Sequence, residues 1–237
     1  MSRARDIADG NFANDLTVDT NTLKVDSANN RVGIGTAPDR DLHVKGATGD
    51  PVHLKLEGDP ADYARIMFDD GTDDNIGEIR YHFGDENMRF TVNAAERLRI
   101  HASGSVTMPN QPVYSASDSR ALSGSNSHLN SSNFYNHEYV NVGNHMNTSN
   151  GNFTCPVAGV YRIYFRATHE NQGCNVRLQK NGSTINEAFS GAPGSDYSVS
   201  SEAVVSCAAN DTLRIQFASI DMKSGNQHKQ VTFQLLH

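Results

Sequence analysis

The sequence predicts an all-β protein in which several β modules follow one another along the chain. Apolar residues recur at positions i and i+2 in short segments, which is the spacing of one face of a strand. Gly, Asn and Asp gather between these segments, as they do at turns, and no amphipathic helix of useful length is present. The chain has 237 residues, of which 37% are hydrophobic, and its mean hydropathy is −0.55. A chain this polar can be ordered when identical copies share a core, so we expect an oligomer.

The first 46 residues divide into two segments. Residues 1–14 are interpreted as a short anchoring segment that is too short to fold alone. Its candidate contact residues are Arg3, Arg5 and Ile7. Residues 15–46 carry a weak repeat of apolar pairs, which are Leu16/Val18, Leu23/Val25, Val32/Ile34 and Leu42/Val44. Two inward residues per strand bury too little area in one chain to offset its conformational entropy. The repeat therefore predicts a β-structured stalk shared by three chains, with an irregular linker as the alternative.

The remainder of the chain is predicted to hold a β-meander and a C-terminal β domain. Residues 47–108 form the meander, with strands expected at 52–56, 64–68, 78–83, 88–92, 97–101 and 105–108. Gly, Asn and Asp at the bends between them are hairpin signals. Residues 109–134 shift to a Pro-containing and then Ser/Asn/Gly-rich composition, which predicts a linker that leads into the next domain. Residues 135–237 form that domain.

A signature within the C-terminal domain carries a family resemblance. Residues 150–165 read Asn-Gly-Asn-Phe-Thr-Cys-Pro-Val-Ala-Gly-Val-Tyr-Arg-Ile-Tyr-Phe, which is a turn, a short strand, a Pro/Gly corner and a long strand. This segment resembles the signature of C1q-like domains, and residues 174–182, 211–217 and 231–236 resemble further parts of the family pattern. Asn210 and Gln234 stand where that pattern usually has Gly. The resemblance implies a jelly roll over residues 135–237, with residues 112–116 as its first strand. It also implies a homotrimer that binds at its outer surface and catalyses nothing.

Aromatic residues and cysteines on these expected strands are the candidate core. The aromatic residues are interpreted as packing both inside each sandwich and along a threefold axis. They are Phe153, Tyr161, Phe165, Phe217 and Phe233. The three cysteines, Cys155, Cys174 and Cys207, are an odd number, which excludes a complete intrachain disulfide framework. Their plain interpretation is buried thiols. The C1q resemblance implies instead a Cys155–Cys174 pair, whereas assembly in a reducing cytoplasm favours thiols. The redox state of the pair stays open at this stage.

A second resemblance lies in the N-terminal region. Residues 23–38 read Leu-Lys-Val-Asp-Ser-Ala-Asn-Asn-Arg-Val-Gly-Ile-Gly-Thr-Ala-Pro, and Leu42-His-Val follows. This run resembles a repeat common in tail-fibre and other appendage proteins of bacteriophages. Residues 95–106 are similar to a companion phrase, although Ser105 and Thr107 replace its usual Gly-Ile-Gly continuation. The resemblance implies a virion protein that is assembled in a host cytoplasm and exposed on the particle exterior. It would attach to other virion proteins through residues 1–14.

Charge and motif content exclude several other classes of function. The net charge of −7 gives no electrostatic support for nucleic-acid binding. The N-terminus lacks the apolar stretch of a secretory signal, and no apolar run approaches the ~20 residues that span a bilayer, so we expect no membrane insertion. The ten histidines lack metal-ligand spacing and no Gly-x-Ser-x-Gly elbow is present, so no catalytic residue, metal site or cofactor is predicted. The acidic run Asp69, Asp70, Asp73 and Asp74 is interpreted as a hairpin tip, with calcium binding as the alternative.

Together these observations predict a non-enzymatic, homotrimeric bacteriophage virion protein. Its C-terminal head would attach to polysaccharide or protein on the host cell surface. The alternative is a head fibre or capsid-decoration protein that braces the shell, and a third, weaker one is a polysaccharide depolymerase, because carboxylate pairs meet only in space. The candidate surface contacts lie in polar loops, at Asn171, Gln172, Asn181, Ser195, Asp196, Tyr197 and Asn226. The sequence distinguishes neither tail from head nor one receptor or host from another.

Overall fold

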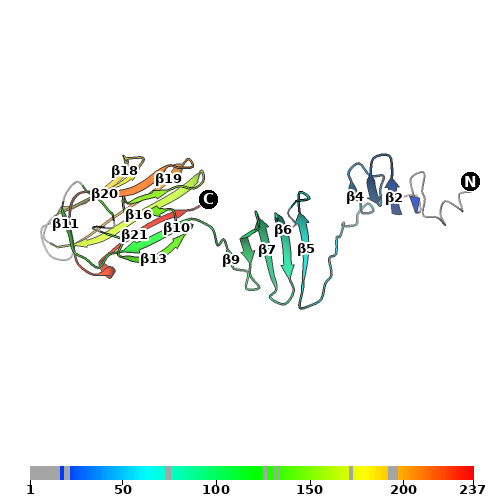
Figure 1. Ribbon diagram of the computed structural model, residues 1–237, viewed down its shortest axis with the longest axis horizontal. Helices are drawn as coiled ribbons and strands as arrows, with labels where there is room; N and C mark the ends of the chain where they lie inside the picture. The colour runs from blue at the N-terminus through cyan, green and yellow to red at the C-terminus, as the bar shows by residue number, and fades with distance from the viewer. Residues whose placement is uncertain are drawn as a thin grey trace, which may run out of the picture. The chain divides into compact units, whose positions relative to one another are not determined.

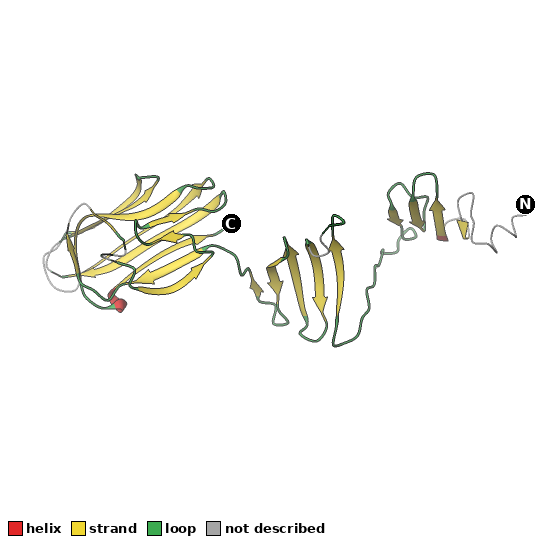
Figure 2. Cartoon of the chain, viewed as in Figure 1, coloured by secondary structure: helices red, strands yellow, loops and turns green. Residues whose placement is uncertain are grey.

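The computed structural model describes residues 17–18, 22–72, 76–124, 127–130, 132, 134–170, 173–191 and 197–237. These residues form strands joined by turns, with one short 3₁₀ segment, η1 (Asn226–His228), so the all-β prediction is confirmed (Figure 2). The chain separates into two compact units, residues 1–64 and residues 65–237. The predicted anchor residues Arg3, Arg5 and Ile7 lie outside the described residues.

The first unit contains a small sheet of four short strands in chain order. These are β1 (Thr17–Val18), β2 (Leu23–Asp26), β3 (Arg31–Ile34) and β4 (Leu42–Val44). β2 and β3 form an antiparallel hairpin, whereas β4 pairs with β3 in parallel. The register places Leu23 opposite Ile34, and Val25 opposite Val32. The apolar pairs read from the sequence therefore share one face of a sheet, and the irregular-linker alternative is wrong.

Residues 45–62 connect this sheet to the next one without regular structure. The strand predicted at residues 52–56 is therefore wrong. Val52, Leu54 and Leu56 do alternate as in a strand, but all three side chains are exposed and the described residues offer them no pairing partner. A strand exists only when a neighbour accepts its backbone hydrogen bonds, and alternation within one segment does not supply that neighbour.

Five strands, β5 to β9, form a second sheet with a simple meander order (Figure 1). They are β5 (Tyr63–Phe68), β6 (Gly77–His82), β7 (Asn87–Val92), β8 (Ala95–Ile100) and β9 (Val106–Thr107). Left-handed residues close two of the turns, namely Glu86 before β7, and Asn93 with Ala94 before β8. A register shift in the β7–β8 pair, between Phe90 and Thr91, marks a β-bulge in β8.

The C-terminal part is a two-layered antiparallel sandwich, a jelly roll. Its strands are β10 (Val113–Ser117), β11 (Leu122–Gly124), β12 (Ser127–His128), β13 (His137–Val142), β14 (Met146–Asn147), β15 (Asn152–Thr154), β16 (Gly159–His169), β17 (Cys174–Lys180), β18 (Ser183–Ser190), β19 (Tyr197–Cys207), β20 (Thr212–Met222) and β21 (Lys229–Leu235). One layer has the order β13-β10-β21-β16-β19, and the other has β18-β17-β20-β15-β14. β11 and β12 also pair with β20. The first strand therefore lies within residues 109–134, as the resemblance implied.

The core lies between these two layers, and every buried hydrophobic residue of the described chain belongs to it. The five predicted aromatic residues, Phe153, Tyr161, Phe165, Phe217 and Phe233, are at most 1% exposed. The rings of Phe153 and Phe233 stack across the layers with centroids 5.4 Å apart. These rings are enclosed within one chain, so they cannot also line an axis between chains, and that part of the expectation is wrong. Any threefold contact must use the outer faces.

The three cysteines are free thiols buried in this core. Cys155 bonds through its backbone to Asp211, at the start of β20, whereas the β17 strand that begins at Cys174 reaches Ser219 at the other end of β20. With a rise of about 3.3 Å per residue, the two thiols are ~25 Å apart along the sandwich. A disulfide requires Cα atoms within about 7 Å, so the Cys155–Cys174 pairing is wrong. The thiol near Cys155 is that of Cys207.

Candidate interaction surfaces of the jelly roll

The outer face of the β13-β10-β21-β16-β19 layer is polar. In β16 the inward residues alternate with Arg162, Tyr164 and Arg166, which face away from the core. The Arg162 guanidinium donates two hydrogen bonds to the Glu202 carboxylate of β19, at 2.8 and 2.9 Å, and lies 5.4 Å above the Tyr164 ring. These hydrogen bonds lower the pKa of Glu202 below its usual value. The pair fixes the side chains across β16 and β19, although an exposed pair contributes at most about 1 kcal/mol.

A shallow hollow lies at one end of the same face. It has a volume of about 220 Å³ and is bordered by Tyr164, Arg166, Ser198 and Ser200, with Gln227 and His228 of the η1 segment at its side. Enclosed small-molecule sites are usually larger, about 300–1,000 Å³, and mostly apolar. This polar depression therefore suits contact with another surface better than capture of a substrate.

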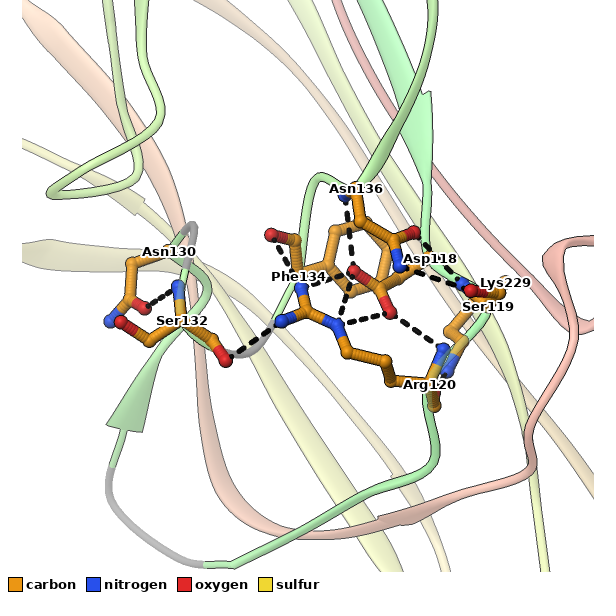
Figure 3. A network of polar contacts seen from close by, with 8 residues as sticks. All are labelled: Asp118, Ser119, Arg120, Asn130, Ser132, Phe134, Asn136 and Lys229. Carbon is orange, nitrogen blue, oxygen red and sulfur yellow. Dashed lines mark hydrogen bonds and ion pairs between the residues drawn. The ribbon is translucent and has the colours of Figure 1, made fainter.

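A buried polar network ties the long connection between β10 and β13 to the core (Figure 3). The Asp118 side chain is fully buried and accepts hydrogen bonds from the Arg120 side chain at 2.6–3.2 Å. It also accepts bonds from the backbone N–H groups of Arg120 and Asn136, at 2.7 and 3.1 Å. Lys229, at the start of β21, is 1% exposed, and its Nζ donates to the Arg120 carbonyl oxygen. The Asp118 carboxylate thus connects two parts of the loop, and the Lys229 amine joins the loop to β21 through the Arg120 carbonyl oxygen.

The electrostatics of this network follow from burial and charge. Burial alone would raise the pKa of Asp118, but the hydrogen bonds from Arg120 and Asn136 outweigh it, and the pKa is lowered. Burial lowers the pKa of Lys229, and the nearby negative charge of Asp118 opposes that shift. Asp118 therefore favours the charged form of Lys229, whereas Arg120 and Asn136 favour the charged form of Asp118. The network shapes the surface loop from within, and a buried charge with such partners is structural rather than reactive.

The predicted loop contacts differ in where the structure places them. Asn171, Gln172, Ser195 and Asp196 lie outside the described residues. Asn181 occupies a left-handed turn between β17 and β18, where its side chain bonds Asp211 and the backbone of Thr212, so its role is to clasp two turns together. Tyr197, at the start of β19, is 44% exposed, and its ring stacks on buried His169. Asn226 begins η1, beside the hollow.

Sequence analysis missed Phe189, the most exposed aromatic residue of the jelly roll at 68%. It lies near the end of β18, on the outer face of the second layer, two residues from Glu187, which pairs with Arg177 at 3.1 Å. The sequence Ser-Thr-Ile-Asn-Glu-Ala-Phe-Ser does carry a signal. Its alternation puts Phe189 on the same side as the charged Glu187, which marks an outward position. Aromatic residues are enriched at binding surfaces relative to the rest of a protein's surface.

Other chemistry finds no support in the described part of the chain. Within it, no group of three His, Cys, Asp or Glu side chains converges as metal ligands would. Asp69 and Asp70 cap their own turn by accepting bonds from Gly71 and Thr72, as expected for a hairpin tip. Asp73 and Asp74 lie outside the described residues. The described part of the chain holds no helix with the length and hydrophobicity needed to span a membrane.

One family model and several solved structures match part of this chain. The family model "C1q domain" matches residues 113–234. This chain belongs to the C1q domain family. The globular domain of zebrafish complement 1qA protein is similar in structure, with 18% identity, a TM-score of 0.45, and coverage of 54% of this chain and 98% of that one. Murine APRIL is also similar, with 12% identity, a TM-score of 0.43, and coverage of 53% of this chain and 99% of that one. Eiger TNF from S. frugiperda is similar with 13% identity, a TM-score of 0.42, and coverage of 54% of this chain and 94% of that one. None of the curated proteins matches the chain.

The family assignment sets the class of function. C1q/TNF-like domains commonly form homotrimers and bind receptors or ligands, and they are typically non-catalytic. No enzymatic family is indicated for this chain. The polar outer faces described above are therefore the surfaces to consider for binding, and the enclosed core is not.

Proposed function

We propose that this chain is a homotrimeric structural protein of a bacteriophage virion that presents its C1q head for attachment to a host surface. The observation that carries the proposal is the arrangement of modules. Two thin sheets, β1–β4 and β5–β9, precede one C1q jelly roll, and the described residues of neither sheet contribute to a hydrophobic core. A single-layered sheet leaves its apolar face in water, and sharing that face between chains would bury it.

The virion setting is supported by the sequence phrase at residues 23–38. That phrase forms the β2–β3 hairpin, with a left-handed Asn30 at its turn and Gly35 hydrogen-bonded to Thr22 just after β3. The structure explains why residue 33 of this phrase is a glycine. A Cβ on Gly33 would meet the Thr36 carbonyl oxygen and the Pro38 ring, so the Pro-containing corner needs a residue without a side chain. In this proposal, residues 1–14 attach to other virion proteins and the head faces outward.

The host-facing surface would be the jelly roll, with Tyr197, Asn226 and Phe189 as candidate contacts. A trimer would present three copies of each weak contact on one rigid head, which raises the overall affinity through avidity. Polysaccharide and protein on the host surface both fit exposed aromatic and amide groups. The combined variant Phe189→Ala/Tyr197→Ala should reduce competition of the purified protein with particle adsorption, while Glu202→Ala, an exposed change further along β19, serves as the control. Unchanged competition by the double variant would overturn this assignment of the binding face.

The short β1–β4 sheet also favours a second candidate, a head fibre or capsid-decoration protein that braces the shell. Its strands have two to four residues, which gives little reach. The two candidates differ in position on the particle. Immunogold electron microscopy with an antibody against residues 135–237 should label the tail for an attachment protein and the head for a decoration protein. Particles without label would overturn both.

A further inference from the structure

The β5–β9 sheet is a single layer with one apolar face and one mainly charged face. The register aligns Ile79 with Phe90 and Leu98, and it aligns Tyr81 with Met88, Ile100 and Val106. Since side chains alternate between faces, one face is apolar in every row. Its members are Ile66, Phe68, Ile79, Tyr81, Met88, Phe90, Val92, Leu98, Ile100 and Val106.

The opposite face carries charged side chains that form ion pairs with one another. Glu78 is 7% exposed and contacts Arg65 at 3.4 Å and Arg80 at 3.1 Å. Glu96 contacts Arg99 at 2.6 Å, and hydrogen bonds from Arg99 lower its pKa. Simple alternation from Leu98 would place Glu96 on the apolar face, but the β-bulge in β8 turns Glu96 to the charged face. There Glu96 and Glu78 line one surface depression of this sheet, which is separate from the hollow on the jelly roll. The sheet thus keeps charge off its apolar face.

That apolar face is uncovered in a single chain. Val106 is 54% exposed and Phe68 is 55% exposed, and the described residues hold no side chain of this sheet within the buried core. Five strands at about 4.8 Å spacing and six residues at about 3.3 Å give a face of roughly 400 Å². This is as large as the biggest apolar patch on a typical monomer, and such patches mark contact sites.

We infer that this face packs against the same face of two further copies of the chain, so that three sheets enclose a shared apolar core. The inference rests on the proposed homotrimer and extends it to residues 63–107. The occupant must be apolar throughout, because burying a charge or an unpaired polar group against this face would be costly. Another copy of the face meets that requirement, and the ion-paired side then remains in water.

The covalent connection also favours the same chain as occupant. Residues 108–112 alone join β9 to β10 of the C1q head. C1q/TNF-like heads commonly form homotrimers. A trimeric head would hold three β5–β9 sheets on short tethers, at an effective concentration on the order of millimolar. The three β5–β9 sheets attached to a threefold head would be related by the same threefold axis, so three apolar faces rather than two would meet.

Adjacent residues of β9 provide the test. In full-length protein, Val106→Cys places a thiol on the apolar face and Thr107→Cys places one on the charged face, and both positions are exposed in a single chain. The three native thiols are buried, and burial raises the pKa of each, so they react slowly. Maleimide should label V106C at least about tenfold more slowly than T107C in native protein, because access controls thiol reactivity. Both should react equally in denaturant. On the opposite edge strand, Phe68→Cys and Met67→Cys form a second matched pair.

Light scattering on the same samples tests the homotrimer separately from the shared apolar core. A trimeric mass with protected V106C and F68C supports the shared core. A trimeric mass with equal labelling of both faces overturns it while leaving a head-based trimer intact. A monomeric mass overturns the homotrimer and the shared core together, whatever the labelling.

Discussion

Replacement of Asp118 by Ala should destabilise the jelly roll by about 3–5 kcal/mol, because it removes one partner of a buried charge network. The carboxylate is fully buried and accepts bonds from the Arg120 side chain and from the backbone N–H groups of Arg120 and Asn136. Its loss leaves those N–H groups unsatisfied and removes the charge that favours protonated Lys229. The Arg120 side chain is 40% exposed and can regain water, so we expect the lower end, about 3 kcal/mol.

Urea denaturation at fixed protein concentration, followed by circular dichroism, measures this loss. Glu202→Ala breaks an exposed pair and should cost less than about 1 kcal/mol. Lys229→Met removes the buried amine with little change in shape, so adding it to Asp118→Ala should recover part of the loss. The pH dependence has a definite sign. The folded pKa of Asp118 is depressed, so its contribution is present above the unfolded pKa near 3.9 and is lost as pH falls. If Asp118→Ala costs no more than Glu202→Ala, the network does not hold the loop.

Three further outcomes are expected. Tyr161→Ala should lower the free energy of unfolding by about 3–5 kcal/mol, because the ring is fully buried. Tyr161→Phe should lower it by only about 1 kcal/mol, because it removes only the hydroxyl bond to Val157. Equal effects of the two variants in denaturation would contradict the packing role. Gly151→Ala should cost about 2 kcal/mol or more, because φ is +73° and the new Cβ would meet the Leu129 carbonyl oxygen; an unchanged melting temperature would show a different turn. Asp211, bonded to Asn181, Lys180 and Ala208, should titrate by NMR with a pKa of about 2, and Asn181→Ala should raise it toward the usual value; a normal pKa in the unmodified chain would refute the clasp.

Much of the fold is readable from sequence where the local pattern is also the pairing pattern. The apolar pairs Leu23/Val25 and Val32/Ile34 predict short strands with one apolar face, and these residues form β2 and β3. The long alternation through Tyr161 and Phe165 correctly predicts an inward face of β16. Even buried Lys229 has a signal, since it stands in phase with Val231 and Phe233 along β21.

The errors arise where distant pairing decides the outcome. Val52, Leu54 and Leu56 alternate, but no described strand lies beside them to complete a ladder. Cys155 and Cys174 are close in sequence, yet the strand register places them at opposite ends of β20. The partners Asp118 and Lys229 are over a hundred residues apart, so no local pattern relates them. The bulge in β8 likewise comes from pairing with β7, and it reverses the face that alternation would assign to Glu96.

The position of β21 has a consequence for synthesis. This strand is the last of the jelly roll in chain order, yet it lies between β10 and β16, so the layer cannot close before it has left the ribosome. β9 ends at Thr107 and β21 ends at Leu235. At roughly 5–20 residues per second, the β5–β9 segment therefore waits on the order of ten seconds for a finished head. During that interval its apolar residues are exposed to every neighbouring nascent chain. The arginines and glutamates that alternate with them along the strands are the kind of charged residue that limits aggregation of exposed apolar strands.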